Sequence, residues 1–595
     1  MRELPTSRSL RSRLLPYLAR HRRGLAWGLS ALLATNVVAL IQPQVLRHAV
    51  DDLYGGVTAA KLGRYALVLF GIAVVSGVFK YAMRLTVIGI SRRIEYDLRN
   101  DLFAHLQRLP LEHFQRARIG EIMSRATNDL AAVRMMLGPG VMYLANTCVV
   151  AVISLGFMLA INPWLTLLSL LPLPIVTLMV WTFGDQIHRR FESIQGHFAG
   201  ISARVQENLA GVRVVRSYAR EAHEIEAFRV LNEEYARRNL ELIRVSNLEL
   251  IRVSGVFHPA LAFLSGLAAL IALYVGGRDV MTGRITLGQF VAFTVYLGML
   301  NWPVVALGWV VNLFQRGAAS FGRLAELLEQ APAITSLPGA LSPARCRGAL
   351  SFRHLTFAFP GAAEQALRDV SFEVPAGRTV AIVGGTGSGK STVLALVPRV
   401  FDPPPDTVLL DGRDVRTLDL AWLRGHIAYV PQDAFLFSAS VADNIAYGVE
   451  RATPEQIAAA ARVAHFEDDA RGLPAGFETR VGERGITLSG GQKQRVTLAR
   501  AVLRDAPVLL LDDCLSSVDT HTEEAILQAL RAVMRGRTTL IVSHRVSAVR
   551  EADQILVLDE GAIAERGTHD QLVAAGGRYA RLVRDQQLEE ELRAS

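Results

Sequence analysis

One segment of this 595-residue chain has the residue types and spacing of a phosphate-binding loop. Its residues are Gly384, Gly385, Thr386, Gly387, Ser388, Gly389, Lys390 and Ser391, followed by Thr392. The spacing G-x-x-x-x-G-K-S comes after an apolar run that predicts a short buried strand, so the glycines let backbone N–H groups close around nucleotide phosphates. Lys390 is expected to bridge the β and γ phosphates, and Ser391 is expected to hold Mg²⁺.

A second segment, which we call the signature segment, offers another site for an anion. It consists of Leu488, Ser489, Gly490, Gly491 and Gln492. Because Ser489 and Gly491 open a predicted helix, the segment presents backbone N–H groups, a hydroxyl and a helix N-terminus to a phosphate. Further along, the apolar run from Val508 to Leu511 predicts a strand ending in Asp512, an acid placed to position Mg²⁺ through water.

A phosphate loop alone occurs in many nucleotide hydrolases, but together with the signature segment it resembles the ATP-binding cassette (ABC) family. The resemblance implies that two cassettes sandwich ATP head to tail, each phosphate loop facing the signature segment of the other chain. With one cassette per chain, a dimer is then obligatory.

The resemblance also implies roles for single residues. Phe359 is expected to stack on adenine, with core packing as the alternative. Gln432 is expected to approach Mg²⁺, and His544 to contact the γ-phosphate. Asp519 matches the loop that contacts the opposite site. Arg480, in the loop before the signature segment, stands where an acid is usual in the family.

The residue after Asp512 departs from the family pattern. The family normally places glutamate there to orient and activate the attacking water, whereas this chain has Asp513, one methylene shorter. We expect the shorter arm to misplace the water and slow hydrolysis by about 10²-fold or more. Our interpretation is a heterodimer in which this chain's own site turns over slowly and its signature segment completes the partner's site. The alternative is a homodimer with Asp513 as an adequate base.

The composition divides the chain into two halves. Apolar residues make up 51% of the chain, which is unusual for a soluble protein. Up to about residue 330 there are apolar stretches long enough to cross ~30 Å of hydrocarbon, whereas the remainder has the pattern of an α/β domain. We therefore predict a transmembrane domain over 1–330, a linker over 331–349 and an α/β P-loop nucleotide-binding domain over 350–595.

Six membrane spans are predicted, at 24–46, 64–86, 138–161, 163–184, 254–276 and 284–314. Six arginines between positions 8 and 23 precede the first span and place the N-terminus in the cytosol, where a short helix in the membrane interface is expected. About 50 and about 70 polar residues with helical periodicity separate spans two and three, and four and five. The predicted fold class is thus a membrane α-helical bundle with long cytosolic extensions, followed by the nucleotide-binding domain.

This pattern of long inside and short outside segments resembles the exporter-type membrane domain of the ABC family. Within the extensions, 114–129 and 207–216 resemble the coupling helices that transmit motion between the two halves, with solvated charged helices as the alternative. Polar residues within the spans are candidates for a substrate path, although hydrogen bonding to a neighbouring helix is the more common role. They are Asn36, Gln42, Asn146, His258 and Asn301.

Charge and cysteine content argue against other classes. The net charge is +9, but the basic residues mainly flank apolar stretches, so nucleic acid is not an expected partner. Cys148, Cys346 and Cys514 lack metal-ligand spacing. The six spans exclude a soluble cassette ATPase of nucleic-acid repair or translation. The basic N-terminus leads into an apolar stretch that is too long for a cleaved signal and is expected to remain as the first helix.

The resemblance implies ATP-driven export of hydrophobic or amphipathic compounds, either drugs or lipids, across the cytoplasmic membrane by alternating access. The expected cofactors are ATP and Mg²⁺, and the expected partners are membrane lipids, the transported small molecule and a second half-transporter. The chain is expected to hydrolyse ATP as a multi-pass protein of the inner membrane, with its ATPase domain in the cytosol. Import through an exporter-like fold is the alternative.

Overall fold

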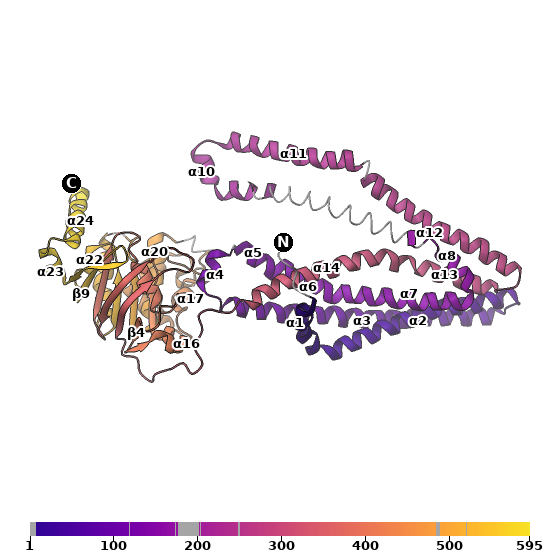
Figure 1. The fold of residues 1–595 in the computed structure, drawn as a ribbon, viewed down its shortest axis with the longest axis horizontal. Coiled ribbons are helices and arrows are strands. Elements are labelled where there is room, and N and C mark those ends of the chain that lie inside the picture. The colour runs from indigo at the N-terminus through magenta and orange to yellow at the C-terminus, as the bar shows by residue number, and fades with distance from the viewer. Residues whose placement is uncertain are drawn as a thin grey trace. The chain divides into compact units, whose positions relative to one another are not determined.

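A computed structural model describes most of the chain. The described residues are 7–117, 119–172, 174–175, 201–202, 204–247, 250–482, 488–518 and 520–594. The chain divides into two compact units. The membrane unit is formed by Met1–Leu106 and Ile119–Gln330, and the cassette is formed by Gln107–Arg118 and Ala331–Ser595. Figure 1 shows the long helices of the first and the sheets of the second.

The described part of the membrane unit contains five helices long and apolar enough to cross a membrane. They are Arg22–Leu53, Ala59–Leu106, Ile119–Ile161, Ala262–Met281 and Leu287–Glu329. The remaining predicted span, 163–184, begins as helix α8 (Pro163–Leu170) and continues into residues outside the described ranges. Six spans therefore stay a prediction. The predicted N-terminal helix is present as α1 (Ser7–Arg20), and its place in the membrane interface stays a prediction.

Helix α3 (Ala59–Leu106) extends well past the membrane, and α2 (Arg22–Tyr54) lies beside it (Figure 1). Its 48 residues at 1.5 Å per residue span about 72 Å, more than twice the ~30 Å of hydrocarbon. In the extension, Ile94, Leu98 and Leu102 are at most 2% exposed. Their spacing of four residues puts them on one buried face, as the helical periodicity predicts.

Two π-helical turns, Arg125–Asp129 and Met136–Gly140, interrupt the helix Ile119–Ile161. Each turn packs against α14 (Asn301–Glu329). Arg323 Nε donates to the buried Asp129 carboxylate at 2.9 Å. The first π turn is thus ion-paired to α14 through Asp129, and the second packs against the same helix. Such turns occur frequently at functional sites.

The last predicted span, 284–314, overlaps the membrane-crossing helix Leu287–Glu329, which a single residue, Leu300, divides into two labelled helices. Helix α13 (Leu287–Met299) starts at a capping box formed by Thr286 and Gln289, and α14 begins at Asn301. Proline lacks an N–H and its ring disfavours a continuous preceding helix, so Pro303 is accommodated in the first turn of α14.

The cassette contains two sheets. The larger has the order β10-β9-β3-β8-β7-β6 and is parallel except for the pairing of β10 with β9. Its strands are β3 (Thr379–Gly384), β6 (Ile427–Val430), β7 (Val508–Asp512), β8 (Thr538–Val542), β9 (Gln554–Asp559) and β10 (Ala562–Gly567). The smaller, antiparallel sheet has the order β2-β1-β4-β5. Its strands are β1 (Leu350–Phe357), β2 (Leu367–Val374), β4 (Val408–Leu410) and β5 (Arg413–Asp414).

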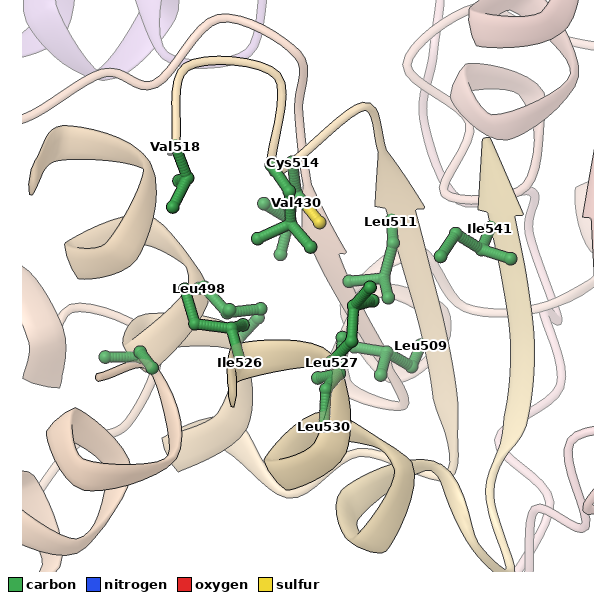
Figure 2. Packing of buried hydrophobic residues seen from close by; sticks show 14 of the residues in the cluster. Val430, Leu498, Leu509, Leu511, Cys514, Val518, Ile526, Leu527, Leu530 and Ile541 are labelled. Carbon is green, nitrogen blue, oxygen red and sulfur yellow. The ribbon is translucent and has the colours of Figure 1, made fainter. Parts of the chain in front are cut away.

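Strand β7 is buried on both faces, as expected for a central parallel strand. Leu509 and Leu511 belong to one hydrophobic cluster, and Val508 and Leu510 to the other. Figure 2 shows the first cluster, in which side chains of α20 (Gly490–Arg504) and α21 (Thr520–Met534) surround Leu509 and Leu511. The signature helix α20 and the strand that ends at Asp512 therefore share one core.

Candidate functional site

The phosphate loop joins β3 to α15 (Lys390–Leu396) through strained glycine positions. Gly389 has φ +94°, and a Cβ there would lie 2.6 Å from the carbonyl oxygen of Ala366. A Cβ on Gly384 would lie 2.2 Å from the carbonyl oxygen of Leu558. Only glycine fits both positions, so backbone rather than side chains lines the loop.

Lys390 is 6% exposed and turned into this loop. Its Nζ donates to the carbonyl oxygens of Gly384 (3.0 Å) and Gly385 (2.7 Å). Burial lowers the pKa of Lys390, whereas the charges of Asp513 and Asp512 act in the opposite direction. A buried ammonium beside open backbone donors matches the chemistry of a nucleotide polyphosphate.

Ser391 and Asp512 meet at the end of the loop. Ser391 Oγ donates to Asp512 Oδ1 at 2.9 Å. Asp512 is 2% exposed, and burial, followed by the charge of Asp513, raises its pKa. Tyr429 of β6 also interacts with this carboxylate. A hydroxyl and a carboxylate oxygen side by side are suitable ligands for Mg²⁺.

Asp513 follows β7 in a left-handed backbone conformation, with φ +44°. Its N–H donates to the carbonyl oxygen of Val542 at 2.9 Å, and the residue is 8% exposed. His544 comes two residues after Val542 and is half-buried, and Gln432 comes two residues after β6 and is exposed. The carboxyl ends of β6, β7 and β8 therefore bring Gln432, Asp513 and His544 to one edge of the sheet, where ligands of parallel α/β sheets bind.

Phe359 is 37% exposed and packs edge to face against two other rings. Ring centroids lie 5.2 Å from Phe357 and 5.1 Å from Phe401. One face of the ring is thus supported by aromatic packing while part of it reaches solvent. Arg116, in α4 (Leu111–Arg116) and within the predicted coupling segment 114–129, donates to the carbonyl oxygen of Pro360 at 2.7 Å.

The signature segment caps α20. The Ser489 side chain accepts from the Gln492 N–H (3.2 Å), and the Gln492 side chain accepts from the Ser489 N–H (2.9 Å). This reciprocal capping box leaves the serine hydroxyl proton free to donate. A Cβ on Gly491 would lie 2.8 Å from the carbonyl oxygen of Ser517, so only glycine allows this close approach. Leu488 is buried and Gly490 is exposed.

The predicted residues fall into two groups. Lys390, Ser391, Asp512 and Asp513 interact directly, by hydrogen bond or charge. Within the described ranges, no hydrogen bond joins the signature segment to the phosphate loop. Asp519 and residues 483–487 lie outside the described residues, while Arg480 forms a β-bridge with Ser440.

Two of the polar residues in the predicted spans hydrogen bond within the helices. Asn36 Nδ2 donates to the carbonyl oxygen of Leu32 at 3.0 Å and is 6% exposed. Asn301 Oδ1 accepts from Ser265 Oγ at 3.3 Å. Asn36 thus bonds to its own helix α2, and Asn301 joins α14 to a neighbouring helix, α12 (Leu250–Met281), which is a common role for polar residues in membrane helices. A role of these residues in a substrate path stays a prediction. The His258 side chain lies outside the described part of the chain.

Residues 25–304 match the family model of the ABC transporter transmembrane region, and residues 367–516 match that of the ABC transporter. The probable multidrug resistance ABC transporter ATP-binding/permease protein YheI of Bacillus subtilis is 38% identical over 562 residues, which is 94% of this chain and 94% of that protein. The ATP-dependent lipid A-core flippase of Thiobacillus denitrificans is 33% identical over 580 residues, covering 97% of this chain and 98% of that protein.

The solved structure of a bacterial Atm1-family ABC exporter with ATP bound is also similar to this chain. It has a TM-score of 0.79 and 28% identity, and the match covers 96% of this chain and 99% of that one. The chain therefore belongs to the ABC transporter family and has the fold of its exporters. It is a membrane protein whose cassette binds and hydrolyses ATP.

Proposed function

We propose that this chain is one half of a dimeric exporter that uses ATP to move hydrophobic or amphipathic compounds across the cytoplasmic membrane. The observation that carries the proposal is the presence, in one chain, of exporter-type membrane helices and a phosphate loop whose Lys390 and Ser391 lie beside Asp512. Similar proteins are named as multidrug resistance transporters and as lipid A-core flippases, which supports drugs or lipids as the transported class. The basic residues before the first span support a cytosolic N-terminus and cassette.

In this proposal each residue of the site has a distinct role. The loop N–H groups and Lys390 bind the phosphates of ATP, and Ser391 with Asp512 holds Mg²⁺, approached by Gln432. Mg²⁺ would neutralise charge on the transferred phosphoryl group. Asp513 orients the attacking water, and His544 donates toward the γ-phosphate.

A second cassette completes the site. The signature segment has a hydroxyl proton that the capping box does not use and lies at a helix N-terminus, and both features suit an anion such as the γ-phosphate bound by the opposite chain. ATP drives the change from inward-open to outward-open only because it binds the closed pair of cassettes more tightly than the separated pair.

We further propose that the dimer is a heterodimer and that this chain carries the slower site. The support is Asp513, whose side chain is one methylene shorter than that of glutamate. Its backbone is held by the hydrogen bond from its N–H to the carbonyl oxygen of Val542, so the carboxylate lies closer to the backbone than a glutamate carboxylate would. The intact signature segment would then serve the partner's faster site. A homodimer in which Asp513 is an adequate base is the competing hypothesis.

The two hypotheses differ in the ATPase activity of the chain purified alone. Negligible turnover alone, restored by a second half-transporter and lost when the partner's glutamate but not Asp513 is changed, would support the heterodimer. Vigorous, vanadate-sensitive turnover by the chain alone would refute it. Export is tested in liposomes with a fluorescent hydrophobic dye and a fluorescent lipid, with Lys390→Ala as the matched inactive control.

A further inference from the structure

The signature segment is bonded to an acidic residue outside every motif. Gln492 Nε2 donates to Asp469 Oδ1 at 2.9 Å, while Gln492 Oε1 accepts from the Ser489 N–H at 2.9 Å. A carboxylate only accepts hydrogen bonds, so Asp469 determines which end of the Gln492 amide faces Ser489. A reversed amide would bring two oxygens together at Asp469 and two N–H groups together at Ser489.

Asp469 is itself held firmly in α19 (Glu467–Gly472). Its Oδ2 lies 2.5 Å from Arg495 Nη1, and the two side chains are 22% and 15% exposed. Arg495 also donates to the carbonyl oxygen of His465 at 2.6 Å. Because Gln492 and Arg495 are three residues apart on α20, one carboxylate binds two neighbouring positions on the same helix face.

The other flank of the helix is held as well. Gln494 Nε2 donates to Ser516 Oγ at 2.9 Å, and Gln494 Oε1 accepts from the Ser517 N–H at 2.9 Å. The first turn of α20 is therefore fixed on one side by the loop after β7 and on the other by Asp469. Of these two contacts, the one to Asp469 acts directly on the capping box.

We propose that Asp469 is a positioning residue for the signature segment. Through Gln492 it fixes Ser489, whose oxygen is occupied by the Gln492 N–H (3.2 Å), so that the hydroxyl proton points to the phosphate on the opposite cassette. The inference rests on the proposed function, in which the signature segment acts across the dimer. Asp469 acts only through Gln492, and it contacts neither phosphate nor metal.

The test is Asp469→Ala in the full-length, ATPase-active dimer. Loss of a hydrogen bond to a charged group is expected to lower kcat about tenfold. ATP affinity of the nucleotide-binding step before closure should stay unchanged, because it does not depend on the orientation of Ser489. The Tm should fall, because the ion pair between Asp469 and Arg495 is lost. Asp468→Ala is the matched control, since that side chain lies on the same helix and is 96% exposed.

A double-mutant cycle separates positioning from general structural support. In a Gln492→Ala background, Asp469→Ala should have no further effect on kcat. An equal loss in both backgrounds would overturn the proposal, because Asp469 would then act by another route. If Asp469→Ala does not fold, Asp469→Leu replaces it, because leucine has a similar shape and cannot accept the hydrogen bond from Gln492. The same loss of about tenfold in kcat is expected, and full activity overturns the proposal.

Ser489→Ala distinguishes failure of this inference from failure of the proposed function. If Ser489→Ala lowers kcat while Asp469→Ala has no effect, the role of Asp469 is wrong and the trans-acting signature stands. If Ser489→Ala itself has no effect, the proposed function of the signature segment is wrong, and the role of Asp469 falls with it.

Discussion

The proposal that Asp513 makes this chain's ATP site the slower one predicts that Asp513→Glu speeds hydrolysis there. The backbone at this position cannot shift to compensate for a short arm, because its N–H is bonded to Val542 and its φ is +44°. Glutamate extends the carboxylate by one carbon–carbon bond, about 1.5 Å, and a misplacement of 1 Å at a reacting group costs about 10²-fold in rate. We therefore expect turnover at this site to rise by about 10²-fold.

The same change has a predictable effect on stability. Aspartate tolerates the left-handed region better than glutamate, because its short side chain can bond locally to the backbone. Asp513→Glu should therefore destabilise the cassette by up to about 1 kcal/mol, which lowers Tm by about 2–4 °C for a domain of this size. A faster but slightly less stable protein is the expected combination.

The assay is vanadate-sensitive ATP hydrolysis by the wild-type chain and the variant, each alone and with a partner half-transporter. Asp513→Asn is the control, since it keeps the size of the side chain and removes the base. The idea that the shorter side chain limits hydrolysis would be refuted by three results together. The wild-type chain would hydrolyse ATP vigorously, Asp513→Asn would abolish this activity, and Asp513→Glu would not raise it.

Three further predictions concern other parts of the chain. Gly491→Ala should lower Tm, because its Cβ would lie 2.8 Å from a backbone oxygen, a clash that costs about 1–3 kcal/mol. Gly490→Ala is the control and should leave Tm unchanged or raise it, since its Cβ would lie 3.5 Å from the nearest atom. Equal changes in Tm for the two variants would contradict the close approach at Gly491. Burial raises the pKa of Asp512, and the negative charge of Asp513 raises it further. As the pH falls, Asp512 in the folded site is therefore protonated at a higher pH than an ordinary aspartate carboxyl. Protonation removes the free-energy cost of burying its charge. Mg²⁺-dependent ATP binding, measured by fluorescence titration, should weaken over the pH range in which Asp512 is protonated. Asp513→Asn should shift this weakening to lower pH. An unchanged pH dependence would show that Asp513 does not influence the titration of Asp512. Arg323→Ala should destabilise the membrane unit by about 2 kcal/mol, since it leaves a buried carboxylate unpaired, and neutralising that carboxylate should restore part of the lost Tm in detergent.

The parts of the site that are contiguous in sequence could be predicted. The spacing that ends in Lys390 and Ser391 encodes a loop whose glycines leave no room for side chains. The capping box of Ser489 and Gln492 can be inferred in the same way, because the two residues are three positions apart at a helix start. Local chemistry decides these features, so no knowledge of the rest of the fold is needed.

Features that depend on tertiary packing could not be predicted. Asp469 lies in a run of three acidic residues that is typical of any helix N-terminus, and only the packing of α19 against α20 shows which of them reaches the signature segment. The left-handed backbone of Asp513 is likewise set by its bond to β8 rather than by its neighbours in sequence. The single-residue interruption at Leu300 has no hydropathy signal, because it lies within one continuous apolar stretch.

The division of the chain into units has a mechanical consequence. The polypeptide passes between the membrane unit and the cassette three times: after Leu106, before Ile119 and after Gln330. A domain joined by one linker can rotate without moving the rest of the chain, whereas a domain joined at three points transmits its rotation to the segments that hold it. The segment Gln107–Arg118, bonded to the cassette through Arg116 and Pro360, ties two long helices to the same cassette. Movement of the cassette should therefore act on both α3 and the helix that starts at Ile119, and lengthening the linker after Gln330 alone should not uncouple ATP hydrolysis from transport.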